Sequence, residues 1–545
     1  MIFLSTLLLS VFITIALIPL CSRVAVRAHA LDMPDPRKMH TVPVPRCGGV
    51  AMALGALGPI IFWAEMSPQL YAYLAGSAIL FFAGMYDDFK GLSYQAKFMA
   101  QVMAALLLVL YGGVMISDVG NLLPSDIIIP GWLAAILTVV FVVGVTNAIN
   151  LADGLDGLAG GISLLIFLII SFLAYLVGNI NVAIIALSIS GSIFGFLRFN
   201  TYPASLFMGD TGSMLLGYSA ATLSITLTQE STLLSPLLPL ILLGFPILDT
   251  LVVMAERVAE GRSPFTADKN HFHHRLMRLG FFQTEAVFTI YVIQVALVVF
   301  AYVFRFSSEW FLLLSYGLFS LLVVGLFTVA DRTGWKLQRF DIIDVVIKGR
   351  LKKLRGNWLG IRISYRVLYI GLPALFIYLT LLPKTIPTYL SIVSAFFAAV
   401  LALVWLFRKD WLSMVFMPCI YIFIPLLIYA GELGSVGWIS PHVAKLHYVA
   451  YIVLTFFSVM TLKFTRRKGG FRVTPMDFIV VLLAVAVMVL PREILPEDAF
   501  KRVIPAMLAM FFAYEVLVGE LRGEMSRLAG VTILSLVIVS IRGVL

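Results

Sequence analysis

Apolar stretches long enough to cross a bilayer recur along nearly the whole chain, which restricts it to folds that pair their backbone polar groups inside the membrane. Of the 545 residues, 61% are hydrophobic and 12% are charged, and the mean hydropathy is +1.00. These values exclude a soluble globular protein of ordinary composition. The first stretch, from Ile2 to Leu20, has no preceding basic residues and no small-residue cleavage site, so we interpret it as a retained helix. The sequence predicts an all-α, polytopic integral membrane protein with about eighteen spans.

The distribution of Lys and Arg predicts which loops face the cytoplasm. If the amino terminus lies outside, the inner loops hold 32 of the 39 Lys and Arg residues. Cytoplasmic loops are enriched in these residues, so this orientation is expected. The formal net charge of +10 then favours attraction to anionic lipid at the inner leaflet, and nucleic acid is not an expected partner.

A basic segment, residues 331–366, divides the chain into two parts. Residues 1–330 contain about eleven predicted spans, and their inner loops are rich in Asp, Asn and His. Residues 367–545 contain about seven more, with loops that carry little besides Lys and Arg. We therefore predict a membrane-embedded catalytic domain, a basic cytoplasmic linker and an additional membrane domain of unknown role.

The densest polar group lies between two apolar segments and contains Asn147, Asn150, Asp153 and Asp156. A carboxylate within the bilayer costs on the order of several kcal/mol, so such a group marks a functional site. On a helical turn, residues three apart share a face, and each pair is therefore expected to point in one direction. Hard oxygen ligands of this kind suit Mg²⁺. The alternative is a polar turn that caps two helices.

Two adjacent carboxylates, Asp87 and Asp88, end another apolar segment, and Lys97 follows in the same inner loop. Because neighbouring like charges repel, either one carboxyl pKa is raised or a cation is shared between the pair. This arrangement suits a general base or a metal ligand. A solvated helix end is the alternative interpretation.

The next inner loop contains Gly209-Asp210-Thr211-Gly212-Ser213 directly before an apolar segment. At the start of a helix, backbone N–H groups and hydroxyls can hold phosphate while Asp210 holds a cation. An ordinary helix cap by Asp210 is the competing interpretation.

Three of the seven histidines fall within His271-Phe272-His273-His274-Arg275, in the fifth inner loop. No cysteine is nearby and no His-Glu-x-x-His pattern is present, so His and Arg as donors to a diphosphate are favoured over a transition-metal site, which stays the alternative. Asp249 lies inside the apolar segment Leu233 to Met254, and we expect it to pair with one of these cations.

Together these loops resemble the polyprenyl-phosphate N-acetylhexosamine-1-phosphate transferases, glycosyltransferase family 4. The resemblance covers about residues 1–330 and rests on Asp87-Asp88, Asn147 to Leu158, Phe207 to Ser213 and His271 to Arg275. The His-x-His-His-Arg form is similar to the branch of undecaprenyl-phosphate N-acetylglucosamine-1-phosphate transferases, which use UDP-N-acetylglucosamine or a related UDP-N-acetylhexosamine. The resemblance implies that a polyprenyl phosphate attacks the sugar-bearing phosphate, that UMP leaves and that a cell-envelope glycan is initiated.

The resemblance also implies roles for single residues. Asn150 and Asp210 are expected to bind Mg²⁺, with Mn²⁺ as the alternative ion. Lys97, Asn147 and Arg275 are expected to bind substrate. The catalytic set that it implies is Asp87, Asp88, Asp153, Asp156, His271, His273 and His274, and it leaves open which of the first two acts as a base.

The expected partners are a UDP-N-acetylhexosamine, a polyprenyl phosphate such as undecaprenyl phosphate, and membrane lipid. We expect a bacterial-type inner membrane with the site facing the cytoplasm, and the oligomeric state, including a homodimer, stays open. One alternative is an activity like that of phospho-N-acetylmuramoyl-pentapeptide transferase, whose branch has a different histidine pattern. A secondary transporter is the second alternative, although it would place its polar groups near the membrane midplane.

Overall fold

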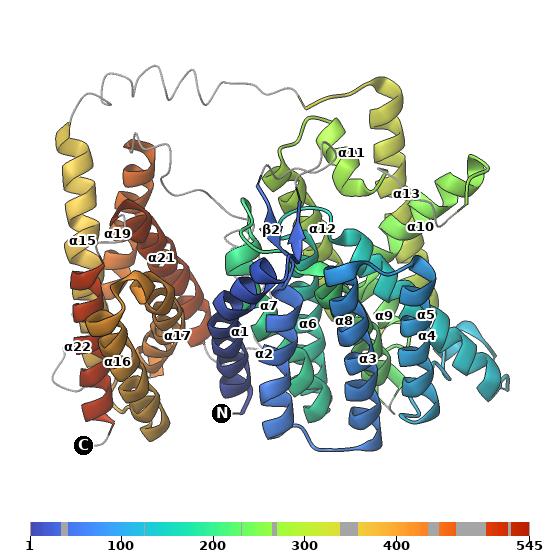
Figure 1. Ribbon diagram of the computed structural model, residues 1–545, viewed down its shortest axis with the longest axis horizontal. Coiled ribbons are helices and arrows are strands. Elements are labelled where there is room, and N and C mark those ends of the chain that lie inside the picture. Colours follow the sequence, from blue (N-terminus) through green and yellow to red (C-terminus); the bar gives the residue numbers. More distant parts are fainter. Residues whose placement is uncertain are drawn as a thin grey trace. The chain divides into compact units, whose positions relative to one another are not determined.

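The computed structural model describes residues 2–33, 42–124, 126–229, 232–263, 270–337, 358–433, 446–464, 498–521 and 525–543. Contacts divide these residues into two units, one within Met1–Gln338 and the other after Arg339 (Figure 1). The predicted boundaries at 330 and 366 stay predictions, because residues 338–357 of the linker lie outside the described residues.

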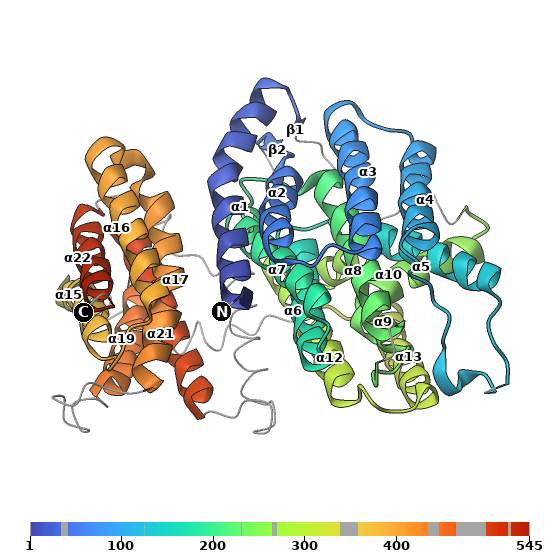
Figure 2. The same ribbon diagram turned by 90° about the horizontal axis from the view of Figure 1, so that it is seen from below.

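Helices form nearly all of the first unit. Its elements are, in chain order, α1 (Ile2–Arg27), β1 (Leu31–Asp32), β2 (Val44–Pro45), α2 (Gly48–Trp63), α3 (Pro68–Lys90), α4 (Tyr94–Leu110), η1 (Gly120–Leu122), α5 (Gly131–Ala152), α6 (Leu158–Leu176), α7 (Ile180–Asn200), α8 (Gly209–Gln229), α9 (Leu238–Leu242), α10 (Gly244–Ala259), α11 (Phe272–Arg278), α12 (Gln283–Val303) and α13 (Glu309–Thr333). Figure 2 shows the long helices of this unit side by side.

The second unit is also helical. Its described elements are α15 (Trp358–Leu381), α16 (Thr388–Phe407), η2 (Lys409–Trp411), α17 (Leu412–Leu433), α19 (Leu446–Phe464), α21 (Asp498–Leu521) and α22 (Ser526–Arg542). Within the described part of the chain, nine helices are long and apolar enough to cross a membrane, and further apolar helices are shorter. The predicted all-α, polytopic membrane class is therefore confirmed, whereas the count of about eighteen spans stays a prediction.

Small residues bring two helices, α2 and α3, into backbone contact with α8. A Cβ atom added at Gly49 of α2 would lie 2.2 Å from the backbone nitrogen of Gly212. One added at Gly84 of α3 would lie 2.5 Å from the Cα of Thr211. Close packing of this kind needs residues without a side chain at the contact. As a result, the start of α8 lies directly beside α2 and the end of α3.

The apolar segment Leu233 to Met254 is not one continuous helix, because it breaks between α9 and α10 at Leu243. Pro246 has no N–H to donate to the carbonyl four residues earlier, that of Leu242. The Gln294 side chain of α12 donates to this carbonyl instead, at 2.9 Å. The Tyr316 hydroxyl of α13 donates to the Gly244 carbonyl at 2.8 Å. The backbone carbonyls at the break are therefore hydrogen-bonded within the protein, as is required inside a membrane.

The first inner loop returns to the bundle as a short hairpin. Strands β1 and β2 pair antiparallel. The chain then passes beside the segment before α8, where the Phe207 N–H donates to the Pro45 carbonyl at 2.9 Å and the Gly48 N–H donates to the Phe207 carbonyl at 2.9 Å. These bonds hold the start of α2 against the start of α8.

Candidate active site

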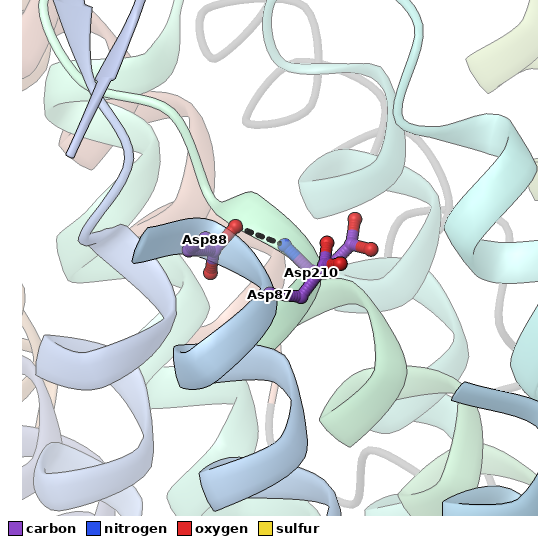
Figure 3. A group of neighbouring side chains, drawn as sticks. All are labelled: Asp87, Asp88 and Asp210. Atoms are coloured by element: carbon purple, nitrogen blue, oxygen red, sulfur yellow. Dashed lines mark hydrogen bonds between the residues drawn. The ribbon is translucent and has the colours of Figure 1, made fainter. Parts of the chain in front are cut away.

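Three carboxylates from two helices gather at one end of the first unit. Asp87 and Asp88 lie in the last turn of α3, and Asp210 lies in the first turn of α8 (Figure 3). One ligand atom from each lies within 4.8 Å of the others. The Asp-Asp pair and the Gly-Asp-Thr-Gly-Ser segment, which are far apart in the sequence, therefore form one acidic cluster.

Asp88 accepts hydrogen bonds from the start of α8 with both of its oxygens. Oδ1 accepts the Asp210 N–H at 2.9 Å (Figure 3), and Oδ2 accepts the N–H and the hydroxyl of Thr211 at 3.0 and 2.6 Å. Gly209 has φ of +71°, and a Cβ there would lie 2.5 Å from Asp88 Oδ2, so a side chain is excluded. Asp88 thus caps α8 and fixes the position of Asp210.

Lys97 of α4 is the cation shared by this cluster. Its ammonium lies 2.7 Å from Asp87 Oδ2 and also pairs with Asp210 Oδ2. The sequence left two alternatives, a raised carboxyl pKa or a cation shared between Asp87 and Asp88. The structure differs from the second alternative, because Asp88 already accepts three hydrogen bonds from α8 and the cation pairs with Asp87 and Asp210. Lys97 therefore bridges α3 and α8.

Asn150 joins the cluster from α5. Its Nδ2 donates to Asp210 Oδ1 at 3.2 Å and to the Ser213 hydroxyl at 2.7 Å. A half turn of the amide would direct its oxygen toward the same point. Asn150 and Asp210, which the resemblance assigns to a metal, are therefore in contact.

Asn147 lies one turn earlier on α5, on the same face as Asn150, as the spacing predicts. Its Nδ2 donates to Gln101 Oε1 at 2.6 Å and to the Val143 carbonyl at 2.8 Å. The Gln101 amide donates back at 3.4 Å. Sequence reasoning missed Gln101, although a polar residue four positions after Lys97 in an apolar helix is a usable signal. This amide pair lies beneath the charged cluster and supports it.

Asp153 and Asp156 lie in a turn between α5 and α6, so the expectation of a shared helical face is wrong for this pair. Helix α5 ends at Ala152, and Gly157, with φ of +80°, directly precedes the first residue of α6. The Gly157 N–H donates to Asn200 Oδ1 at 3.0 Å, and its carbonyl accepts the Tyr291 hydroxyl at 2.6 Å. Asp156 Oδ2 accepts the Ala204 N–H at 2.9 Å. We call residues 153–157 the acidic turn.

The Asp153 carboxyl group lies among other acids. Burial, together with the negative charges of Asp210 and Asp88, raises its pKa from 3.8 to about 7. A carboxyl group with this pKa exists in both protonation states near neutral pH. Such perturbed groups concentrate at functional sites.

The fifth inner loop is anchored to α10 by two acidic residues. Asp249 accepts from the Phe272 N–H at 2.8 Å and lies 2.9 Å from His271 Nδ1, which confirms that its partner belongs to this loop. Arg275 is buried, pairs with Glu256 and donates from Nε to the Asn270 carbonyl at 2.7 Å. Sequence reasoning missed Glu256, although it lies seven residues after Asp249 and hence on the same helical face.

His273 connects this loop with the acidic turn. A Cβ added at Gly154 would lie 2.5 Å from His273 Nε2, and this nitrogen has no hydrogen-bond partner among the described residues. Burial and the neighbouring His274 lower the pKa of His273 to about 3, so its imidazole is neutral at physiological pH. The His274 ring lies beside it, with ring centroids 4.2 Å apart.

These contacts define what the cluster can bind. Carboxylate oxygens outnumber the cationic groups around Lys97, and the amide of Asn150 adds a further oxygen. Hard oxygen donors at this spacing fit a divalent cation such as Mg²⁺, which also takes phosphate oxygens and water as ligands. The donor set therefore fits the ion that the sequence led us to expect.

Comparison with known proteins agrees with this geometry. The model of the family described as glycosyl transferase family 4 matches residues 70–228. The chain is 35% identical over 348 residues to the probable undecaprenyl-phosphate N-acetylglucosaminyl 1-phosphate transferase of Bacillus subtilis (strain 168), covering 64% of this chain and 96% of the relative. The chain belongs to glycosyl transferase family 4. As a family 4 member, it is a multi-pass membrane transferase.

Two further relatives carry related names. The undecaprenyl-phosphate alpha-N-acetylglucosaminyl 1-phosphate transferase of Escherichia coli (strain K12) is 29% identical, covering 65% of this chain and 97% of the relative. The decaprenyl-phosphate N-acetylglucosaminephosphotransferase of Mycobacterium tuberculosis (strain ATCC 25618 / H37Rv) is 33% identical, covering 49% and 74%. The family 4 match includes Asp87, Lys97, Asn150 and Asp210, while α10 and α11 follow it in the chain.

Proposed function

We propose that this family 4 protein transfers N-acetylglucosamine 1-phosphate from UDP-N-acetylglucosamine to a polyprenyl phosphate, releasing UMP. The names of the relatives support the sugar and the lipid carrier. The observation that carries the proposal is the convergence of Asp87, Lys97, Asn150 and Asp210 from α3, α4, α5 and α8. Transfer between two phosphates needs such a charged, preorganised site more than covalent chemistry.

Asp87, Asp210 and Asn150 would hold Mg²⁺, and Mn²⁺ would suit the same oxygen donors. The ion, when bound, would neutralise charge on the phosphate oxygens. We assign no metal contact to Asp88, because both of its oxygens accept hydrogen bonds from α8. Asp87 is therefore the member of the Asp-Asp pair that we assign to the reacting groups.

The side chains of this site bring two anionic substrates together. Lys97 offers an ammonium to phosphate oxygens beside Asp210, and neutral His273 lies against the acidic turn. An oxygen of the lipid phosphate attacks the sugar-bearing phosphorus, the bond from that phosphorus to the oxygen of UMP breaks, and a lipid-linked diphosphate sugar forms. The attacking phosphate is already ionised near pH 7, so positioning and charge neutralisation supply more of the rate than a general base.

We further propose that the reaction takes place at the cytoplasmic face of a bacterial inner membrane and initiates a cell-envelope glycan. The excess of Lys and Arg in the loops around the site supports this orientation. The lipid phosphate would reach the site from the bilayer, because Asp87 and Asp88 lie at the end of α3, an apolar helix of membrane-spanning length.

The proposal is tested with the purified full-length protein, undecaprenyl phosphate and Mg²⁺. UMP release is measured with UDP-N-acetylglucosamine, UDP-N-acetylgalactosamine and UDP-N-acetylmuramoyl-pentapeptide, with and without EDTA. We expect EDTA-sensitive turnover with UDP-N-acetylglucosamine. Turnover confined to the muramoyl substrate would support the alternative branch, and no UMP from any of the three would refute the enzyme assignment.

A further inference from the structure

Helix α10 carries two acidic residues that together hold the fifth loop. Asp249 and Glu256 are seven residues apart, so they lie on one face of α10, two turns from each other. Asp249 holds the His271 ring and the Phe272 N–H, at 2.9 and 2.8 Å. Glu256 holds the Arg275 guanidinium. The first and last residues of the His-x-His-His-Arg sequence are therefore each fixed by one acid.

Burial makes these contacts strong constraints. The exposed fractions are 4% for Asp249, 5% for His271 and 5% for Arg275. Removing one partner of a buried ionic contact leaves the other group without compensation, which is costly. The contact of Asp249 with His271 is buried on both sides, whereas the Glu256 carboxylate that holds buried Arg275 is 34% exposed, so we expect Asp249 to be the stronger anchor.

The two acids also fix the orientation of the His271 ring and the Arg275 guanidinium. A carboxylate facing Nδ1 keeps a proton on that nitrogen, so Asp249 sets which ring nitrogen of His271 carries hydrogen. Glu256 and the Asn270 carbonyl engage Nη2 and Nε of Arg275, which fixes the plane of its guanidinium. Between these anchors, His273 lies against Gly154 of the acidic turn with its Nε2 unpartnered among the described residues.

We propose that Asp249 and Glu256 are positioning residues of the transferase, which hold the fifth loop against the acidic turn so that its His and Arg side chains meet the nucleotide sugar. This inference rests on the proposed function for the identity of the ligand. Neither acid contacts the reacting atoms in this scheme. They act through His271 and Arg275, and their contribution concerns the nucleotide sugar and not the lipid phosphate.

The variants Asp249→Asn and Glu256→Gln test this in the full-length protein, with Glu260→Gln as the matched control. Glu260 lies on the same stretch of chain and pairs with Arg262, but both side chains are exposed. We expect KM for UDP-N-acetylglucosamine to rise roughly tenfold or more in the first two variants, by analogy with residues that orient a ligating histidine. KM for undecaprenyl phosphate should change less than about twofold, and Asp249→Glu should recover part of the loss.

Equal rises in both KM values, or the same change in Glu260→Gln, would overturn the positioning role and leave only a structural one. Backbone hydrogen exchange supplies a readout that does not depend on activity. In Asp249→Asn and Glu256→Gln, exchange should accelerate in residues 270–280 and stay unchanged in α6 and α8. Unchanged exchange in residues 270–280 would refute the anchoring itself. If the wild-type protein released no UMP from any UDP-N-acetylhexosamine, the proposed function would fail while exchange still reported on the anchors.

Discussion

The two units of this protein satisfy their polar side chains in different ways. In the second unit, several part-buried polar groups bond to one another: Tyr421 donates to Glu515, and Arg542 donates to the carbonyls of Thr380 and Pro383 at 2.6 Å each. In the first unit, acidic groups gather at helix ends with fewer cations than carboxylates.

This difference indicates where ligands bind. Buried polar groups that satisfy one another stabilise a bundle and have little capacity left for a ligand. A cluster with excess negative charge, such as Asp87 and Asp210 around Lys97, lowers the stability of the fold. In membrane proteins such clusters therefore mark functional sites. We therefore expect the chemistry of the chain in its first unit, which contains the whole family 4 match.

The largest expected difference between the units is in turnover after one acid is removed from each. We expect Asp210→Asn to lower turnover by on the order of a thousandfold, because it removes a charge at the site of phosphoryl transfer. Glu515→Gln should leave turnover within about twofold, since its partner Tyr421 lies in the second unit. UMP release at saturating Mg²⁺ measures both. Full turnover in Asp210→Asn would contradict the expected difference between the two units.

The two units should also differ in how a Gly→Ala substitution changes their stability, because their helices are packed differently. Gly49→Ala would place a methyl group 2.2 Å from the Gly212 backbone, and overpacking of this kind costs about 1–3 kcal/mol. Gly530→Ala in α22 meets only Trp405 at 3.9 Å, and it should stabilise the helix by about 0.5–1 kcal/mol. The midpoint of thermal unfolding in detergent should therefore fall in Gly49→Ala and rise in Gly530→Ala. Equal midpoints would show that the contact between α2 and α8 is not tight.

Asp153 of the acidic turn should also make the stability of the first unit sensitive to pH. The folded-state pKa of Asp153, about 7, lies above the ordinary carboxyl value of 3.8, so folding favours the protonated form. The resulting stabilisation is complete below about pH 4 and is lost as the pH rises through about 7. Asp153→Asn removes this titration. Its unfolding midpoint relative to wild type should therefore be higher at pH 8.5 than at pH 5, by about 2–4 °C, and a pH-independent difference would contradict the shift.

Much of the fold could be predicted from the sequence because the membrane leaves few choices. Apolar length and loop charge gave the helical class, and the spacing of Asn147 and Asn150 gave their shared face. The break at Leu243 was missed, because it depends on Gln294 and Tyr316, which are distant in sequence and supply the missing donors. A local apolar pattern contains no information about such partners.

For the site, the residue types were predictable and their pairing was not. Polar groups that are far apart in the sequence do lie together, and Asn150 does contact Asp210. The partner of each acid depended on three-dimensional competition: Asp88 is occupied by α8, so Lys97 bridges Asp87 and Asp210 instead. Gln101 and Glu256 were missed because helical spacing places each on the face of a predicted residue but does not show which side chain it bonds to. The sequence identifies which residue types form the site, and packing determines which of them bond to each other.

The smallest effect is expected from removing the second unit. A chain that ends before Trp358 retains every described contact of the candidate site, because all of these lie within the first unit. Of the Bacillus subtilis relative, 96% is covered by 64% of this chain, so that relative has no room for a comparable further third. UMP release by the truncated chain should therefore stay within about twofold of the full-length rate, since a domain with its own core folds independently. Asp210→Asn in the truncated chain is the matched inactive control. A truncated protein that is monodisperse and folded but inactive would show that the second unit takes part in catalysis, and would erase the distinction between the two units.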